Sequence, residues 1–181
     1  MNSQFIEHPI EFIINFCRLL PKDAKLHFDL YSNTKIGKNI EEKMSFRVIE
    51  INHQLFETML EKTTEHKNLS LTSKVTINGE IFHIPIVDFV TTDIDKIKRL
   101  EEIFNYKIKP SYYHSGKSYH AYVPKLLNET QWLDFMAKLL LLNQENDLII
   151  SPRWVGHRLL ARKATLRLNE KPAKIKMLNK V

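Results

Sequence analysis

The sequence predicts an α+β fold in which an RRM-like (ferredoxin-like) unit follows an N-terminal α/β portion. Strand-like alternation recurs between segments with helical spacing. The dipeptide Asn78-Gly79 marks a tight hairpin, and residues 80–150 follow the order β-α-β-β-α-β of the ferredoxin-like unit. We therefore expect a mixed or antiparallel sheet with helices on one face.

Length and composition are those of an ordinary globular protein. The 181 residues, 43% hydrophobic and 27% charged, suffice for a sizeable core. We expect residues 1–181 to form one domain, with the N-terminal portion at 1–79 and the RRM-like core with its basic C-terminal segment at 80–181. The single Cys17 excludes a disulfide framework. Without a transmembrane-length run or a secretory leader, the expected location is cytoplasmic, with no membrane partner.

The N-terminal portion opens with a helix and a strand. Apolar residues at helical spacing predict an amphipathic helix over 8–20, with one proline in its first turn and Pro21 just beyond its end. Alternation predicts a half-buried strand over 25–31. Residues 32–42 are polar and contain a glycine, so we expect a loop that could act as a flap, followed by a short strand at 45–49.

A helix and a hairpin come next. Asn52 is a suitable N-cap for a helix that ends near residue 66. Residues 70–77 and 80–90 are the predicted strands of the hairpin, because both positions of an Asn-Gly type I′ turn need positive φ. Pro85 lies inside the second strand, which is therefore expected to be an edge strand or to contain a bulge.

The second half of the chain alternates helices with short strands. Asp93 and Asn128 are expected to cap helices that extend to about residues 105 and 143. Strands are predicted at 108–114, 118–123, 148–150, 165–168 and 175–178, with a short helix or turn at 153–161.

One turn and the strand after it collect side chains suited to binding phosphate. They are Ser115, Gly116, Lys117, Ser118, His120 and Tyr122. The glycine favours a tight turn, and alternation puts the second serine, the histidine and the tyrosine on one face of the strand. Hydroxyl, imidazole and ammonium donors beside exposed backbone N–H groups suit a phosphate. The alternative is a hairpin strand whose polar face meets water.

Positive charge is concentrated near the C-terminus. Residues 151–181 hold nine Lys and Arg residues against one acid, within a chain of net charge +6. Such a segment is typical of a DNA or RNA partner, although a solubilising tail is the alternative. Apolar residues such as Trp154 lie among the basic ones and favour a structured surface. The residues expected to contact phosphate there are Arg153, His157, Arg158, Arg162 and Arg167.

Asp88 is the best candidate for a metal ligand, because it ends an apolar run. An acid in that position is costly to bury unless it binds a cation or accepts hydrogen bonds. The alternative is that it caps the following turn. Asp93 and Asp147 are weaker candidates, and the first already has a role as a helix cap.

These segments together resemble the archaeo-eukaryotic primase superfamily, including small bacterial primase-polymerase-like proteins. The run 115–120 is similar to the Ser-x-His motif of that family, with Ser118 and His120 in the matching places. Residues 86–90 resemble its Asp-x-Asp motif, but Val90 replaces the second acid. The acid of the third motif is absent from the strand at 148–150, and only the aspartate just before it could substitute.

The resemblance implies that His120 contacts nucleotide phosphates and that active members use Mg or Mn held by clustered carboxylates. The missing acids favour a protein that binds nucleotides or nucleic acid, has lost or weak polymerase activity, and is accessory to replication, repair or mobile elements. Enzymatic activity is left open, with its absence favoured.

Two alternatives remain. The first is an active small primase or polymerase, in which Asp88 and one of Asp93, Asp95 or Asp147 converge on Mg or Mn. The second is a protein-interaction module whose basic surface docks an acidic protein partner.

Overall fold

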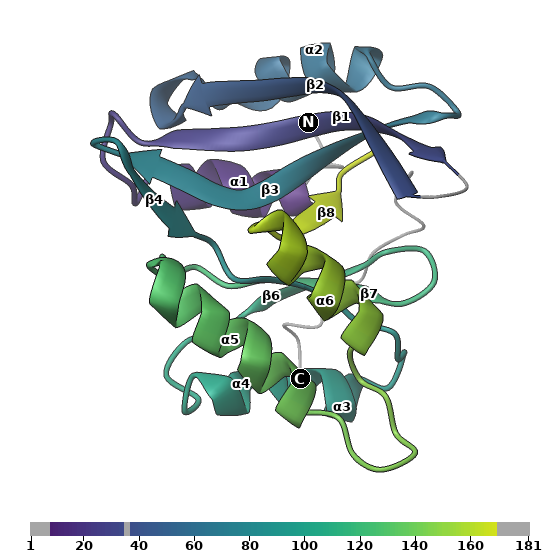
Figure 1. Ribbon diagram of the computed structural model, residues 1–181. Coiled ribbons are helices and arrows are strands. Elements are labelled where there is room, and N and C mark those ends of the chain that lie inside the picture. Colours follow the sequence, from purple (N-terminus) through teal and green to yellow (C-terminus); the bar gives the residue numbers. More distant parts are fainter. Residues whose placement is uncertain (1–7, 35–36, 170–181) are drawn as a thin grey trace, which may run out of the picture.

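The computed structural model describes residues 8–34 and 37–169, and it confirms the α+β class (Figure 1). The strands are β1 (Lys25–Thr34), β2 (Gly37–Arg47), β3 (Lys67–Ile77), β4 (Glu80–His83), β5 (Ile86–Asp88), β6 (Ser111–His114), β7 (Tyr119–Tyr122) and β8 (Thr165–Arg167). The helices are α1 (Pro9–Cys17), η1 (Val48–Glu50, a 3-10 turn), α2 (His53–Glu61), α3 (Ile94–Lys98), α4 (Leu100–Ile103), α5 (Glu129–Leu141) and α6 (Pro152–Ala161). The predicted strand at 175–178 lies outside the described residues.

The strands form two antiparallel sheets. The five-stranded sheet has the order β2-β1-β3-β4, with β8 paired to β3 beyond the end of β4. The three-stranded sheet has the order β5-β7-β6. Figure 1 shows the five-stranded sheet above and the three-stranded sheet in the middle, with α3, α4 and α5 beneath it.

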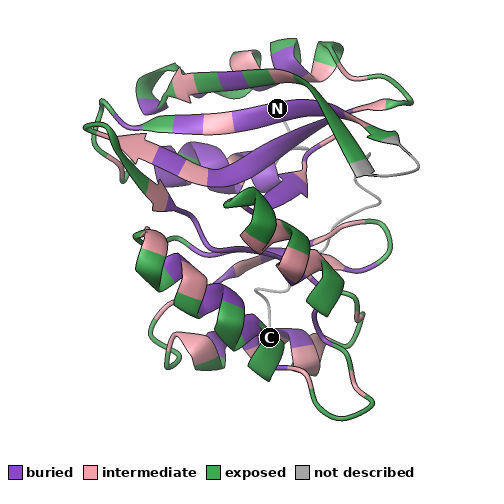
Figure 2. Cartoon of the chain, viewed as in Figure 1, coloured by how far each residue is buried: buried purple, intermediate pink, exposed green. Residues whose placement is uncertain are grey.

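The predicted loop at 32–42 is wrong, because most of this segment belongs to the β1–β2 hairpin. Tyr31 lies opposite Ile40, and pairing continues to the last described residues on each side of 35–36. The edge strand β2 has one neighbour in the sheet, so its side chains can meet water, and polar residues are tolerated there. Figure 2 shows β2 as largely exposed beside the buried β1 and β3.

The Asn-Gly hairpin is confirmed. Asn78 and Gly79 have φ of 50° and 84°, as a type I′ turn requires, and β3 pairs with β4 from Ile77 and Glu80 onward.

The expected single strand at 80–90 is wrong, because the chain changes sheets at Ile84–Pro85. The N–H of Ile84 donates to the carbonyl of Ser73 in the five-stranded sheet at 2.7 Å. The carbonyl of Pro85 accepts from Val123, next to the three-stranded sheet, at 3.0 Å. Proline has no N–H to continue a ladder, which is why the strand ends here. Two residues therefore join the two sheets.

The three-stranded sheet keeps the ferredoxin-like strand order. A single antiparallel bridge between Phe89 and Ile150 places the segment at Ile150 beside β5. If β5, β6, β7 and this segment are numbered one to four along the chain, their order in space is four-one-three-two, as in the ferredoxin-like unit. The predicted strand at 148–150 is reduced to this bridge. The helix expected over 93–105 is divided into α3 and α4 at Arg99, whereas the caps Asp93 and Asn128 are confirmed by hydrogen bonds from helix N–H groups.

One hydrophobic cluster links the two sheets. Phe12 of α1 packs against Tyr122 of β7, with ring centroids 5.4 Å apart. The five-stranded sheet draws β4 and β8 from beyond residue 79, so it spans the division predicted at 79/80. Among the described residues, no helix has both the length and the apolar character needed to cross a membrane.

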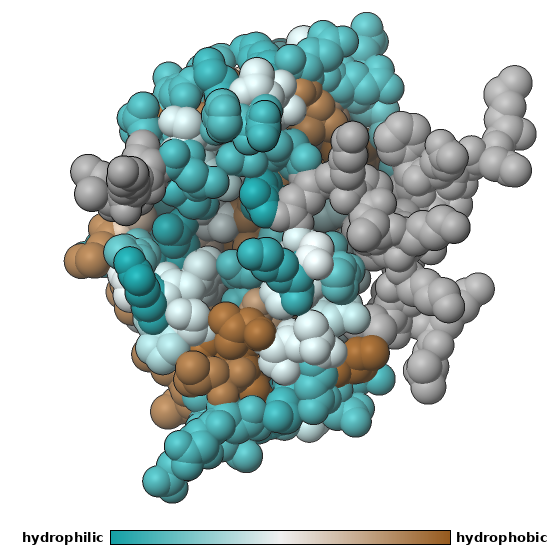
Figure 3. Space-filling model, turned by 90° about the vertical axis from the view of Figure 1, so that its right-hand side faces the viewer, coloured by the Kyte–Doolittle hydropathy of each residue, from teal (hydrophilic) through white to brown (hydrophobic). Residues whose placement is uncertain are grey.

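The outer surface mixes polar and apolar residues. On the side drawn in Figure 3, hydrophilic residues predominate, and hydrophobic residues gather mainly in the lower half of the view. The most exposed large apolar side chain described is Leu160 of α6, at 85% exposure.

Candidate functional site

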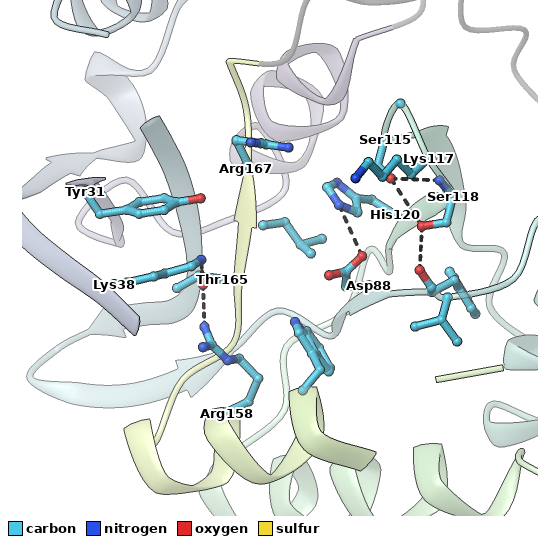
Figure 4. Close-up of a pocket in the computed structure, with 15 residues that line it drawn as sticks. Tyr31, Lys38, Asp88, Ser115, Lys117, Ser118, His120, Arg158, Thr165 and Arg167 are labelled. Carbon is cyan, nitrogen blue, oxygen red and sulfur yellow. Dashed lines mark hydrogen bonds and ion pairs between the residues drawn. The ribbon is translucent and has the colours of Figure 1, made fainter. Parts of the chain in front are cut away.

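A cavity of about 790 Å³ lies where the two sheets face each other. Figure 4 shows the residues that line it. One side is built by Asp88 of β5, by the turn before β7, and by His120 of β7. The other side is built by the β1–β2 hairpin, α6 and β8. The cavity therefore joins the predicted Ser-x-His segment to elements from both ends of the chain.

The turn over Ser115–Ser118 is compact and uses its own backbone donors. Its Gly116 has φ of 98°, which glycine adopts without strain. The N–H of Ser115 donates to the carbonyl of Ser118 at 2.8 Å, and that of Ser118 to Oγ of Ser115 at 3.3 Å. The N–H of Gly116 donates to Nδ1 of His114 at 3.2 Å. The expected cradle of exposed backbone N–H groups is wrong for these three, because each already donates to an acceptor within residues 114–118.

Ser118 and His120 line the cavity, but Tyr122 does not. The hydroxyl of Ser118 donates to the carbonyl of Phe89 at 2.5 Å, which fixes the start of β7 against the end of β5. Tyr122 is fully buried, and its ring lies 5.6 Å from that of Tyr113, edge to face. The expectation that the phenol stands beside the imidazole at a ligand site is therefore wrong.

His120 and Asp88 form a pair at the floor of the cavity. They lie directly opposite each other in the β5–β7 ladder, and Nε2 of the histidine is 3.5 Å from Oδ1 of the aspartate. The histidine side chain is 11% exposed and the aspartate 39%. The carboxylate therefore keeps open coordination directions toward the cavity.

Three cations line the opposite side, which we call the cationic wall: Lys38 of β2, Arg158 of α6 and Arg167 of β8. Thr165 holds the first two together, because its Oγ1 accepts from Lys38 Nζ at 3.4 Å and from Arg158 at 2.5 Å. The ammonium of Lys38 also lies 4.1 Å from the centre of the Tyr31 ring, a cation–π contact. Two regions distant in sequence, β2 and the consecutive elements α6 and β8, thus bring positive charge to one side of the cavity.

Burial and neighbouring charges shift the pKa values of residues in and beside the cationic wall. Burial of the ammonium, then the charges of Arg158 and Arg167, lower the pKa of Lys38 to about 8, with Asp88 acting in the opposite direction. Much of the Lys38 residue is exposed, so the crowding concerns the tip of the side chain rather than its stem. Burial likewise lowers the pKa of Arg158 and raises that of Tyr31. Burial, together with the repulsion between neighbouring cations, therefore dominates the titration of Lys38.

A second cavity, of about 680 Å³, adjoins the first. The two share Tyr31, Lys38, Trp154, Arg158 and Thr165. Two further residues expected to bind phosphate, Arg153 and His157, line only the second cavity.

Arg162 lines neither cavity and lies 3.5 Å from Oε1 of Glu129. The predicted basic residues are thus distributed over two adjoining cavities and one ion pair.

The weaker acid candidates lie elsewhere. Oδ1 of Asp93 accepts from the N–H groups of Asp95 and Lys96 at 3.0 and 3.4 Å, as a helix cap. Oδ1 of Asp147 accepts from Nζ of Lys96 at 2.8 Å. None of these acids lines the cavity of Asp88. Within residues 8–34 and 37–169, no three His, Cys, Asp or Glu side chains cluster as metal ligands.

Sequence reasoning missed Tyr31 and Lys38, although both line the two cavities. Tyr31 was placed on a predicted strand without a role, and Lys38 in a predicted loop. The available signal was a lysine shortly after a strand, which by itself is not specific.

A second histidine–carboxylate pair lies outside the cavities and was also missed. Fully buried His83 is 2.9 Å from Ser73 Oγ through Nδ1 and 3.0 Å from Glu129 through Nε2. Its ring stacks on that of Trp132 at 4.4 Å. The Ser73 hydroxyl also accepts from the N–H of Ala164 at 3.0 Å, so it is fully engaged and enclosed. This network links the five-stranded sheet to α5 and to the start of β8.

The chain was compared with known proteins. A family described as "AEP-like: Archaeo-eukaryotic primase 1D-like" matches residues 47–180, which is most of the chain. The match includes the Asp88–His120 pair, Arg158 and Arg167, but it begins after Lys38. No curated protein and no solved structure matched the chain.

Proposed function

Because the chain belongs to the archaeo-eukaryotic primase 1D-like family, whose function concerns nucleic acid, we propose that it binds nucleotide or nucleic-acid phosphates in the cavity at Asp88 and His120. We further propose that its polymerase activity is lost or weak. Such a protein would be accessory to replication, repair or mobile elements.

One observation carries this proposal: with Lys117, the cationic wall gives the cavity four cations against one carboxylate. Lys38, Arg158 and Arg167 face Asp88, the one acid among the described lining residues. A polyanion is the ligand that such an excess of positive charge favours. The forked guanidinium groups suit phosphate oxygens in particular.

The remaining polar groups have complementary roles in this proposal. His120 would donate to a phosphate through a ring nitrogen, held in place by Asp88. Lys117 would add an ammonium at the rim, on the turn that Ser115 and Ser118 stabilise. The hydroxyl of Ser118 serves the fold, since it donates to a carbonyl.

The divalent metals that the family resemblance implies do not fit this set of side chains. A two-metal site needs several carboxylates to hold ions roughly 4 Å apart. Here a single carboxylate, Asp88, shares the cavity with the cationic wall, which would repel a divalent ion. We therefore assign no catalytic step that depends on Mg or Mn.

The test is a titration of labelled single-stranded and primed DNA at two salt concentrations, with and without Mn²⁺ and nucleotides. Wild type is compared with His120→Ala, and His66→Ala serves as a control because this exposed histidine lies outside both cavities. We expect salt-sensitive binding that only His120→Ala weakens, and no extended product.

Each other outcome has a definite meaning. Primer extension that Asp88→Ala abolishes would show an active polymerase. Absence of binding under every condition would overturn the nucleic-acid proposal and favour a protein partner for the basic surface.

A further inference from the structure

The misfit between this cavity and divalent metals raises the question of what neutralises a bound phosphate. Among the described residues, no carboxylate lies within ion-pair distance of Lys38 or Arg158. Asp88 and Asp29 act on both cations only from longer range, and the carboxylate of Asp29 makes its ion pair with Lys163. Within the described part of the protein, these two cations therefore have no ion pair of their own.

The geometry of Thr165 makes this arrangement unusual. Its hydroxyl oxygen accepts from both cations and so keeps two like charges close together. Arg158 lines both cavities, and Nη1 is the guanidinium nitrogen that donates to Thr165. A guanidinium has five N–H donors, so others remain for an acceptor supplied by a ligand.

The origin of Lys38 adds an independent observation. This residue precedes the part of the chain that matches the primase-like family, and it reaches the cavity only because β2 pairs with β1. The cavity thus gains a positive charge from a segment outside the family match, while only one of the expected strand acids is present.

We propose that Lys38 and Arg158 take the place of a divalent metal, so that the cavity binds the triphosphate of a nucleotide without Mg²⁺ or Mn²⁺. This inference rests on the proposed function, because it uses the same cavity as the phosphate site. The two side chains, joined by Thr165, supply the positive charge that a metal would supply, and Arg158 adds forked donors. His120 contacts the triphosphate from the opposite side.

The experiment is a calorimetric titration of the whole protein with dATP, once in EDTA and once in Mn²⁺. The dissociation constants in the two conditions are expected to agree within about three-fold, because fixed side chains neutralise the phosphates. Lys38→Ala and Arg158→Ala are each expected to weaken binding in EDTA about ten-fold or more. Inorganic triphosphate is expected to compete with dATP, since the recognised chemistry is the phosphate chain.

The control is Lys43→Ala, an exposed lysine on the same strand that lines neither cavity. Lys38 is an exposed residue of an edge strand, so its variant should fold even if Arg158→Ala does not. Binding that requires Mn²⁺, that Lys38→Ala leaves unchanged, or with which triphosphate does not compete would overturn the inference while the proposed function stands. Absence of dATP binding in both conditions would instead count against the proposed function itself.

Discussion

The protein contains two histidine–carboxylate pairs, and their surroundings differ sharply. His83 lies in the core, with Ser73 and Glu129 as partners and Trp132 stacked on its ring. His120 lies at a cavity, and its acid is 3.5 Å away. Both acids are partly exposed, at 46% for Glu129 and 39% for Asp88, so the pairs differ in the surroundings of the histidine. In the first pair every polar group has a partner from the protein, so its role is to stabilise the fold. In the second pair hydrogen-bonding capacity remains, so a ligand can use it.

The largest expected effect is on stability. His83→Ala should lower the free energy of unfolding by about 2–4 kcal/mol, because it removes the ring and leaves Ser73 without its acceptor. His120→Ala should cost about 1 kcal/mol, since its pair is longer and borders a cavity. Urea denaturation of the two variants measures both values. Equal losses would show that the two pairs do not differ as described.

The next effect is a pH dependence of phosphate binding. The pKa of Lys38 is lowered to about 8, and a bound phosphate would raise it. Affinity is therefore complete below the lowered pKa and decreases as the pH rises through it. Between about pH 7 and pH 9.5, affinity should fall about ten-fold or more in wild type.

Lys38→Arg should keep a nearly constant affinity over the same range, because arginine remains protonated. Titrations of triphosphate at several pH values provide the measurement. A wild-type profile as flat as that of Lys38→Arg would exclude Lys38 from the site.

A smaller effect should distinguish Asp88, the carboxylate of the cavity, from Glu129, the partner of the buried His83. Asp88→Asn removes the acid that faces the cationic wall, so affinity for triphosphate should rise about five-fold in EDTA. Glu129→Gln, which lies outside both cavities, should leave affinity unchanged and lower stability instead. Weaker binding by Asp88→Asn in Mn²⁺ would indicate that this carboxylate holds a metal after all.

The smallest effect concerns salt. For single-stranded DNA, the slope of log affinity against log salt concentration should change by about 0.7 when one phosphate contact is lost. Lys38→Ala should show this change, and Lys43→Ala should not. Binding isotherms at four salt concentrations suffice, and identical slopes for the two variants would argue against a phosphate contact at Lys38.

Local signals allowed much of the fold to be predicted from the sequence. The Asn78-Gly79 turn and the caps Asn52, Asp93 and Asn128 were predicted because each depends on the chemistry of a few adjacent residues. The strand β2 was missed because an edge strand does not need apolar alternation. The division at Pro85 was missed because an apolar run carries no mark of which sheet each half will join.

Part of the candidate site could also be predicted from the sequence. Asp88 was found because it ends an apolar run and His120 because it alternates on a strand after a glycine turn; the motif resemblance then supported both, and the structure places them opposite each other. Lys38 could not be found, because its approach to Arg158 depends on the pairing of β2 with β1 and of β8 with β3. Convergence of this kind is set by tertiary structure and leaves no local pattern in the chain.

The crossing at Ile84–Pro85 limits how the cavity can change its width. Two residues span at most about 7 Å, so the sheets cannot draw apart at this point without losing β4 or β5. The same region is held from a third segment, because Ser73, whose carbonyl accepts from Ile84, also accepts from the N–H of Ala164 through its hydroxyl. Any widening of the cavity that keeps these hydrogen bonds must therefore be a rotation about this region and not a separation of the sheets.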